Sequence, residues 1–437
     1  EGRRVVKAEE ILGKIERGED VEYEGVTIGQ GLDLTRLILP KDGDGKLIVS
    51  SSIKIVRSHI QGIVNFEDVV FKEFIDFRNS KFDLASFQGA KFCKYAAFES
   101  TIFGGYGQFS HVHFIGDAIF SNVQFIGDAD FCEAKFKGDA FFWSMDDGKT
   151  TFSGVARFEF VEFCNHVTFH QATFCEKADF QLARFSGKDA LFMGAHFEDG
   201  ADFRGVRFEG AADFRWSKLN KYLNLTRAKI ITFEVEWESI RYILKCDETV
   251  YLALVNSFKN LGRLDDADSC YYQYRRMSQN EKPWYEKKKK WLHRFNWSKL
   301  YDHVSYASCG YGVRLRFPLA WIFGSVFVFG ILYSNMYQLN SINIIILDFI
   351  KIGTLTTILV LGKVSKFDHL DSYLTSVLDQ TYNALIQNIY NIGDSIYLSA
   401  MIFTGQTPVN FQPVGAWKYA VMFESVLGYL LLALFIV

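Results

Sequence analysis

Phenylalanine recurs at a nearly constant step along the first half of the chain. From Phe66 to Phe214 the step between successive Phe residues is mostly five or six. Two positions before a Phe there is usually a small or β-branched residue, as Ala129 stands before Phe131. A step of five matches neither the 3.6-residue period of a helix nor the 2-residue period of a strand. The pattern predicts short extended pieces separated by corners.

Such a pattern is satisfied when successive coils stack and each Phe lies over the next. The small residue then fills a narrower inward position, and coils joined by β-type hydrogen bonds rise ~4.8 Å each. With four sides and roughly twenty residues per coil, the ladder makes about seven coils and a rod of ~35 Å. We therefore predict a β-helix over residues 61–233.

This ladder resembles pentapeptide-repeat proteins, in their Phe-centred rather than Leu-centred form. The resemblance covers about 150 residues, with six-residue steps and a break at Met145–Thr150 as departures. It implies a right-handed quadrilateral β-helix. Within residues 1–60, Val5–Gly18 has helical spacing and would cap the open end of the rod. Val26–Ile63 predicts irregular first coils.

The period becomes helical after Phe233. Residues 251–262 and 263–277 predict a helical hairpin, which opens a connector over residues 234–316. A basic cluster with an adjacent Trp follows, ahead of a long apolar segment: Lys287, Lys288, Lys289, Lys290 and Trp291. This composition predicts contact with an anionic bilayer surface. Because Lys and Arg stay on the cytoplasmic side, it also places the repeat in the cytoplasm.

The region 317–437 contains two candidate membrane spans. Phe317–Tyr337 has 21 residues without a charge, enough to cross ~30 Å of hydrocarbon. Trp417–Val437 is the second, with Glu424 inside it. Residues 338–392 predict an interfacial or extracellular cap, with 342–361 as an alternative third span. The triplet Gly310–Gly312 precedes the first span, so we predict a turn there rather than an ion filter.

Residues 394–410 have the order of a re-entrant pore loop: a short apolar helix, a Gly-containing loop and then a membrane helix. Loop backbone at membrane depth must be enclosed by protein or line water. Residues 395–404 resemble the pore helix of two-transmembrane potassium-channel-like proteins, and the Glu-Ser-x-x-Gly segment at 424–428 resembles their inner helix. The resemblance covers about 120 residues and implies a tetrameric channel.

The loop departs from that family where selectivity is set. Gly405–Asn410 reads Gly-Gln-Thr-Pro-Val-Asn in place of Thr-Val-Gly-Tyr-Gly-Asp. Potassium selectivity needs a column of backbone carbonyls, and Pro408 fixes φ and removes a donor. We therefore predict a filter that is not strongly potassium-selective, formed by Thr404, Gly405, Gln406, Thr407, Pro408, Val409 and Asn410.

The sequence allows two interpretations of each of two residues in the second span, Glu424 and Gly428. Glu424 is either a gating or proton-coupled group, or a hydrogen-bonded strut that holds the pore helix. Gly428 is either the bend of a gate or a packing glycine between helices.

The composition and the motifs argue against several other classes of function. The net charge of -3 and a pI of about 6.4 give no support for nucleic-acid binding. The ladder interleaves Lys and Arg with Asp and Glu, which argues against the DNA mimicry of some soluble pentapeptide-repeat proteins. The 7 Cys form no CxxC pair, so neither a zinc site nor a disulfide framework is indicated. No nucleophile–base pair or phosphate loop is evident, so we predict no enzyme activity and no cofactor.

These features predict a mixed fold: a β-helix, a helical hairpin connector, and an α-helical two-transmembrane pore domain with a re-entrant loop. The leading hypothesis is a multi-pass cell-membrane ion channel, assembled or gated through its cytoplasmic repeat domain. Its expected partners are an inorganic cation, the lipid bilayer and further copies of the chain in a tetramer. The alternative is a membrane-anchored scaffold whose repeat domain binds a protein partner.

Overall fold

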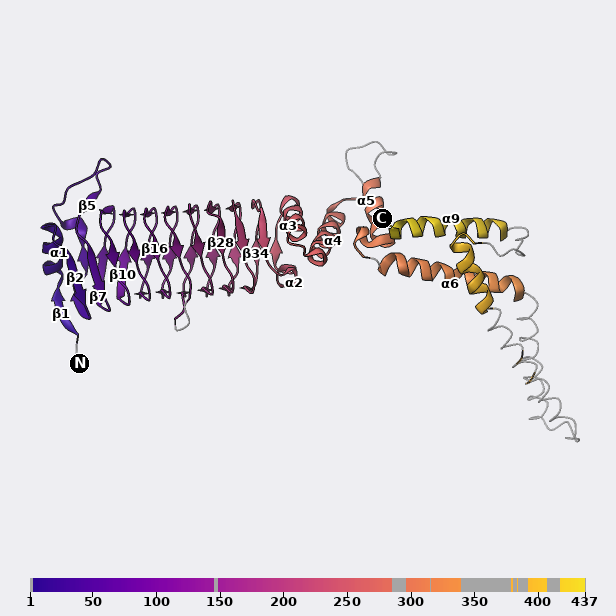
Figure 1. Ribbon diagram of the computed structural model, residues 1–437, viewed down its shortest axis with the longest axis horizontal. Coiled ribbons are helices and arrows are strands. Elements are labelled where there is room, and N and C mark those ends of the chain that lie inside the picture. The colour runs from indigo at the N-terminus through magenta and orange to yellow at the C-terminus, as the bar shows by residue number, and fades with distance from the viewer. Residues whose placement is uncertain are drawn as a thin grey trace, which may run out of the picture. The chain divides into compact units, whose positions relative to one another are not determined.

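The computed structural model describes residues 3–144, 148–284, 296–314, 316–338, 379, 383, 392–406 and 417–436. The chain divides into two compact units, Glu1–Tyr274 and Arg275–Val437. Figure 1 draws the first unit with the indigo to magenta strands and the second with helices α5, α6 and α9.

The first unit is a parallel β-solenoid whose coils follow one another along one axis (Figure 1). The strand pairings form four columns, which make four faces. The first face contains β5 (Leu47–Val49), β8 (Val69–Phe71), β11 (Lys91–Phe92), β15 (His113–Phe114), β19 (Lys135–Phe136), β23 (Glu162–Phe163), β27 (Arg184–Phe185) and β31 (Arg207–Phe208). The second contains β2 (Val21–Glu24), β6 (Ile53–Val56), β9 (Ile75–Asp76), β12 (Ala96–Ala97), β16 (Ala118–Ile119), β20 (Ala140–Phe141), β24 (Val167–Thr168), β28 (Asp189–Leu191), β32 (Ala211–Asp213) and β35 (Thr232–Glu234).

The third and fourth faces belong to one sheet, because two long strands turn the corner between them. These are β7 (His59–Asn65) and β10 (Lys81–Ser86). The third face adds β1 (Arg4–Lys7), β3 (Val26–Gly29), β13 (Ile102–Phe103), β17 (Gln124–Phe125), β21 (Thr151–Phe152), β25 (Thr173–Phe174), β29 (His196–Phe197) and β33 (Lys218–Leu219). The fourth adds β4 (Leu32–Asp33), β14 (Gly107–Gln108), β18 (Ala129–Asp130), β22 (Ala156–Arg157), β26 (Ala178–Asp179), β30 (Ala201–Asp202), β34 (Leu223–Asn224) and β36 (Leu244–Lys245).

The interior is built from the Phe ladder, as the repeat predicts. Phe131 is 0% exposed and stacks between Phe109 and Phe158, with ring centroids 4.9 Å away on both sides. The small inward position two residues earlier is also buried, as at Ala129. Offset stacking of aromatic rings adds to the area that they bury. The core therefore consists of four Phe columns with small residues between them.

The register sets the length of a coil. Phe92 pairs with Phe114, so one coil takes 22 residues, slightly more than the twenty expected from a strict five-residue repeat. The six-residue steps account for the difference. Phe136 pairs with Phe163, 27 residues later, and this longer coil contains the break that the sequence placed at Met145–Thr150. The insertion leaves the pairing on either side in register.

Both ends of the solenoid are covered by helices. At the first end, the predicted helix over 5–18 is divided: β1 joins the third face, and α1 (Ala8–Glu16) buries Ile11 and Ile15. The first coils include the short helix η1 (Leu34–Arg36). At the other end the strands extend to β36, beyond residue 233, with the helical turn α2 (Trp237–Ile240) before it.

The predicted hairpin is formed by α3 (Glu248–Asn260) and α4 (Leu264–Glu281). Leu254 and Phe258 of α3 are fully buried. The Ser257 hydroxyl accepts a hydrogen bond from the Phe233 amide at 2.7 Å and donates one to its carbonyl at 3.2 Å. In this way α3 satisfies backbone groups that the last coil would otherwise leave unpaired.

The second unit is helical. It contains α5 (Trp297–Cys309), the 3-10 turn η3 (Gly310–Gly312), α6 (Arg316–Gln338), a short helix Ile392–Phe403 and α9 (Trp417–Ile436). The segment Arg316–Ser334 is the one helix within the described residues that is long and apolar enough to cross a membrane, judged by length and composition alone. Most of the predicted cap, 338–392, lies outside the described residues.

Candidate functional site

The short helix Ile392–Phe403 packs against both long helices of the second unit. Its Leu398 and Ile402 form one buried cluster with Tyr333 of α6, against which Val421 of α9 also packs. The sequence explains this contact, because 398 and 402 are four residues apart and share one helix face. The segment 395–404 is therefore helical through Phe403, with one face packed against its neighbours and Tyr397 exposed on another.

Glu424 joins three helices through hydrogen bonds. Its side chain is 0% exposed, and one carboxyl oxygen accepts a bond from the Tyr333 hydroxyl of α6 at 2.6 Å. The other oxygen accepts a bond from the Ser399 hydroxyl of the short helix. A buried carboxyl with both oxygens satisfied holds its neighbours in place. This is the geometry expected of the strut; a role for Glu424 in gating stays a prediction.

Two glycines allow the helices to approach closely. A Cβ at Gly428 of α9 would lie 2.1 Å from the Phe403 carbonyl oxygen, and a Cβ at Gly330 of α6 would lie 2.7 Å from Ile396 Cγ1. Small residues at such positions are what lets helix backbones come together. The geometry at Gly428 fits the packing interpretation, and its bending as a gate stays a prediction.

Gly405 ends the short helix. Its φ of +78° is left-handed, its amide donates to the Ile402 carbonyl at 3.0 Å, and the Gln406 amide donates to the Met401 carbonyl at 2.8 Å. This pair of bonds is the Schellman arrangement with glycine just past the helix end. A Cβ at Gly405 would lie 2.2 Å from the Tyr429 hydroxyl oxygen of α9. Thr404 and Gln406 are exposed beside it.

The point where the short helix ends can be located along α9. The helix has 12 residues and is therefore roughly 18 Å long. Its end meets α9 at Gly428, eleven residues and roughly 16 Å after Trp417. Phe403 contacts Gly428 and Ser399 contacts Glu424, so the two helices run in the same direction. The short helix thus stops part-way along its partner.

A charged junction connects the end of α4 with α5 inside the second unit. Asp302 is 3% exposed and pairs with Arg275 at 2.6 Å and with Lys282 at 2.6 Å. The Arg275 guanidinium lies 5.2 Å from the Tyr311 ring centroid. The predicted turn Gly310–Gly312 has positive φ at all three residues and connects α5 to α6. Burial raises the pKa of the Tyr311 hydroxyl.

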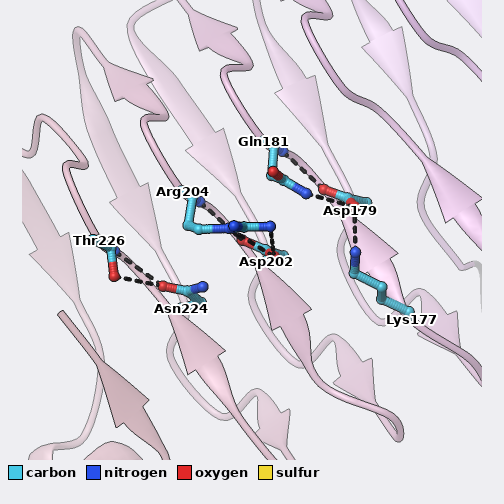
Figure 2. A network of polar contacts seen from close by, with 7 residues as sticks. All are labelled: Lys177, Asp179, Gln181, Asp202, Arg204, Asn224 and Thr226. Carbon is cyan, nitrogen blue, oxygen red and sulfur yellow. Dashed lines mark hydrogen bonds and ion pairs between the residues drawn. The ribbon is translucent and has the colours of Figure 1, made fainter.

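The solenoid surface carries a repeated polar ladder along its fourth face. Figure 2 shows Asp179, Asp202 and Asn224 in successive coils of the fourth face. Each side chain accepts a hydrogen bond at 3.2 Å from the backbone amide two residues later, at Gln181, Arg204 and Thr226 respectively. These polar residues complete the corners of the coils. In the described part of the chain no group of three or more His, Cys, Asp and Glu could hold a metal ion.

The predicted site residues are only partly placed. The described loop residues are Thr404, Gly405 and Gln406, while residues 407–410 and the basic cluster 287–291 lie outside the described residues. Sequence reasoning did not name Tyr333, Ser399, Tyr429 or Asp302. Ser399 could have been found, since a polar residue on the apolar face of a short helix needs a buried partner. The pairing of Tyr333 with Glu424 joins residues 91 positions apart, and no local pattern indicates it.

The comparisons with known proteins bear on the first unit. Residues 98–146 match a family model described as pentapeptide repeats (9 copies). A comparison with curated proteins and another with solved structures found no match. The matched residues lie in the middle of the stacked coils, and their Phe spacing continues on both sides. The N-terminal two thirds of this chain is a pentapeptide-repeat β-solenoid, and a helical region follows it.

Proposed function

We propose that this chain is one subunit of an oligomeric ion channel, with the short helix as a re-entrant pore helix. The observation that carries the proposal is the position where this helix ends. At roughly 18 Å it is too short to cross ~30 Å of hydrocarbon. Its last turn is held part-way along α9 by Gly428 and Tyr429. A chain that ends a helix at this depth must return within protein or beside water.

Side-chain exposure supports a membrane setting for this unit. Phe323 of α6 is 71% exposed, and Tyr419, Met422 and Phe423 of α9 are 73%, 63% and 61% exposed. Such a run of exposed apolar side chains is costly in water and natural in lipid or between subunits. One subunit cannot enclose a pore, so the proposal requires further copies, with a tetramer as the expected number. In this proposal both α6 and α9 cross the bilayer.

A cation is the proposed permeant ion. The carboxyl end of a helix carries a partial negative charge, and the short helix directs that end toward Thr404, Gly405 and Gln406. Carbonyl and hydroxyl oxygens gather there, and Thr404 Oγ1 lies 3.0 Å from both the Ala400 and the Met401 carbonyl oxygens. The loop lacks the Gly-Tyr-Gly column, so the proposed selectivity between potassium and sodium is weak. The solenoid, in its right-handed four-sided form, would lie on the cytoplasmic side and assemble or gate the pore.

Single-channel recording of the purified chain in planar bilayers tests the proposal. With KCl on one side and NaCl on the other, we expect discrete openings and a reversal potential near zero. Gln406→Ala should change the conductance, because this side chain follows the helix end, and Tyr397→Phe is a control on an exposed position of the same helix. Tetramers that carry no current under any gradient, with no path through their centre, would exclude the channel.

A membrane-anchored scaffold is the second candidate, and one observation favours it. Phe160, Leu182 and Trp216 occupy corners of the solenoid with φ of +57°, +58° and +56° and are 58%, 53% and 67% exposed. Bulky residues are disfavoured in this backbone region, and burial in the core does not explain their presence, because more than half of each side chain is exposed. A protein partner that covers these corners would explain why bulky residues stand there. The silent tetramer described above is the outcome that favours this candidate.

A further inference from the structure

A groove of about 470 Å³ runs along α6 and is closed on one side by α9. Its walls are Phe317, Ala320, Trp321, Gly324, Ser325, Val328, Phe329 and Leu427. The α6 residues recur at steps of three and four, so they form one stripe along the helix. From Phe317 to Phe329 the stripe is roughly 18 Å long. A long, narrow and apolar space of this size suits a hydrocarbon chain.

The groove has a cationic end. Arg316 begins α6, directly before the wall residue Phe317 and one helical turn before Ala320. Its guanidinium carbon lies 5.5 Å from the centroid of the Phe317 ring, which is part of the wall. The part of the chain that the structure describes contains no carboxylate paired with Arg316. Long cationic side chains at helix ends extend toward the headgroup layer.

The wall beside this end is fixed in position. The Trp321 indole N–H donates a hydrogen bond to the Ala307 carbonyl of α5 at 2.6 Å, and this bond fixes the ring although half of its surface is exposed. The middle of the groove is open, because a Cβ at Gly324 would meet nothing within 4 Å. The space is therefore a feature of the folded unit, with a rigid aromatic side and an open floor.

We propose that this groove binds one anionic phospholipid, with an acyl chain along α6 and the headgroup phosphate at Arg316. The apolar stripe accounts for the chain, and the unpaired cation at one end accounts for the charge. A neutral lipid would satisfy only the first feature. A second copy of the chain would have to bring an apolar side chain into the groove and an acidic one to Arg316. The proposal depends on the bilayer location of α6 that the proposed function assumes.

Fluorescence quenching by brominated lipids in reconstituted vesicles tests this site. The full chain is placed in phosphatidylcholine vesicles that carry bromine either on phosphatidylglycerol or on phosphatidylcholine, at equal bromine content. The Trp321 signal is the difference between the chain and its Trp321→Phe variant. Near the membrane surface one cationic side chain favours an anionic lipid by about fivefold. We therefore expect brominated phosphatidylglycerol to occupy the site next to Trp321 about fivefold more tightly.

Three variants separate the parts of the proposal. Gly324→Leu fills the groove and should remove the preference, and Ala320→Leu is a second filling variant in case the first fails to fold. Arg316→Gln should reduce the preference about fivefold while leaving quenching by either lipid. Phe323→Leu, which is 71% exposed and does not line the groove, should leave the preference unchanged.

The outcomes distinguish this proposal from the one on which it depends. Equal quenching by both lipids, unchanged by Gly324→Leu, would refute the site and leave the membrane location intact. Quenching of other Trp residues with Trp321 shielded from every lipid would indicate that a second copy fills the groove, which also refutes the site. If no Trp were quenched by any lipid, the membrane location itself would fail.

Discussion

The two units of this chain bury their aromatic residues in opposite ways. In the solenoid, Phe131 and the other ladder residues between Phe66 and Phe214 are at most 2% exposed. In the helical unit the buried cluster contains Tyr333, Leu398 and Ile402, while Phe323 is 71% exposed. The solenoid completes its core within one chain. Among its described residues, the helical unit leaves large apolar side chains exposed, so we expect its stability to depend on what surrounds it.

The largest expected effect comes from opening the core of the solenoid. Phe131→Ala removes a ring that stacks between two others and leaves a cavity, at a cost of about 3–5 kcal/mol. Urea unfolding followed by far-UV circular dichroism measures this cost. Phe141→Ala, on the outward side of β20 where the ring is half-buried, should cost less than a third as much. Equal losses of unfolding free energy at the two positions would show that the buried, stacked column stabilises the solenoid no more than an outward-facing ring.

The second largest effect is expected at the charged junction of the second unit, where polar contacts rather than a core hold the helices. Asp302→Asn leaves Arg275 and Lys282 beside a buried neutral group, and we expect a loss of about 2–3 kcal/mol, since both cations are partly exposed. Hydrogen exchange of the α5 amides in detergent should rise. Asp265→Asn, at an exposed position in the first turn of α4, is the matched control. Unchanged protection of α5 would mean that the junction does not hold this helix.

A third test concerns the contact between α9 and the short helix. Gly428→Ala places a methyl group 2.1 Å from the Phe403 carbonyl oxygen, so the helices must separate, at a cost of about 1–3 kcal/mol. A lower melting temperature in detergent is the expected result. Gly393→Ala adds the same group where nothing lies within 4 Å and should leave the melting temperature unchanged or slightly higher. An unaffected Gly428→Ala would contradict the close packing.

The smallest effect is a gain in stability. Phe160 has a φ of +57° and is 58% exposed, and Asn tolerates this backbone region better. Phe160→Asn should therefore stabilise the solenoid by about 1 kcal/mol. Thermal unfolding of the isolated full chain measures the change. A loss of stability would show that the exposed ring makes contacts that the strain argument neglects.

Most of the solenoid could be predicted from the sequence, because one physical rule repeats there. The five- or six-residue step of Phe, with Ala129 two positions before Phe131, defines both the corner spacing and the inward positions. The ends were less predictable. Residues 4–7 form a strand and are followed at once by α1. The strand is only four residues long, so over a longer window the helical spacing of the next residues hides it.

The candidate site could be predicted only in outline. The order of apolar segments predicted a short helix ahead of the second span, and one interpretation of Glu424 placed the two in contact. The structure brings 398–403 to 424–428. The contact from Tyr333 to Glu424 depends on how two distant helices pack, which no periodicity encodes. Gly405 also ends the short helix, a role that the sequence did not reveal. A glycine in a loop and a glycine that ends a helix look the same in a sequence.

The 27-residue coil shows that the rod tolerates a change in one coil without disturbing the next. Each strand pairs with its counterpart one coil away, and Phe163 pairs with Phe185, so residues 164–185 form one complete turn. Deleting or duplicating such a turn would shorten or lengthen the rod by ~4.8 Å and join matching ends. The length of this domain can thus change by whole coils when the gene segment that encodes one coil is duplicated or deleted. The added coil brings the same core residues, so the core packing need not change.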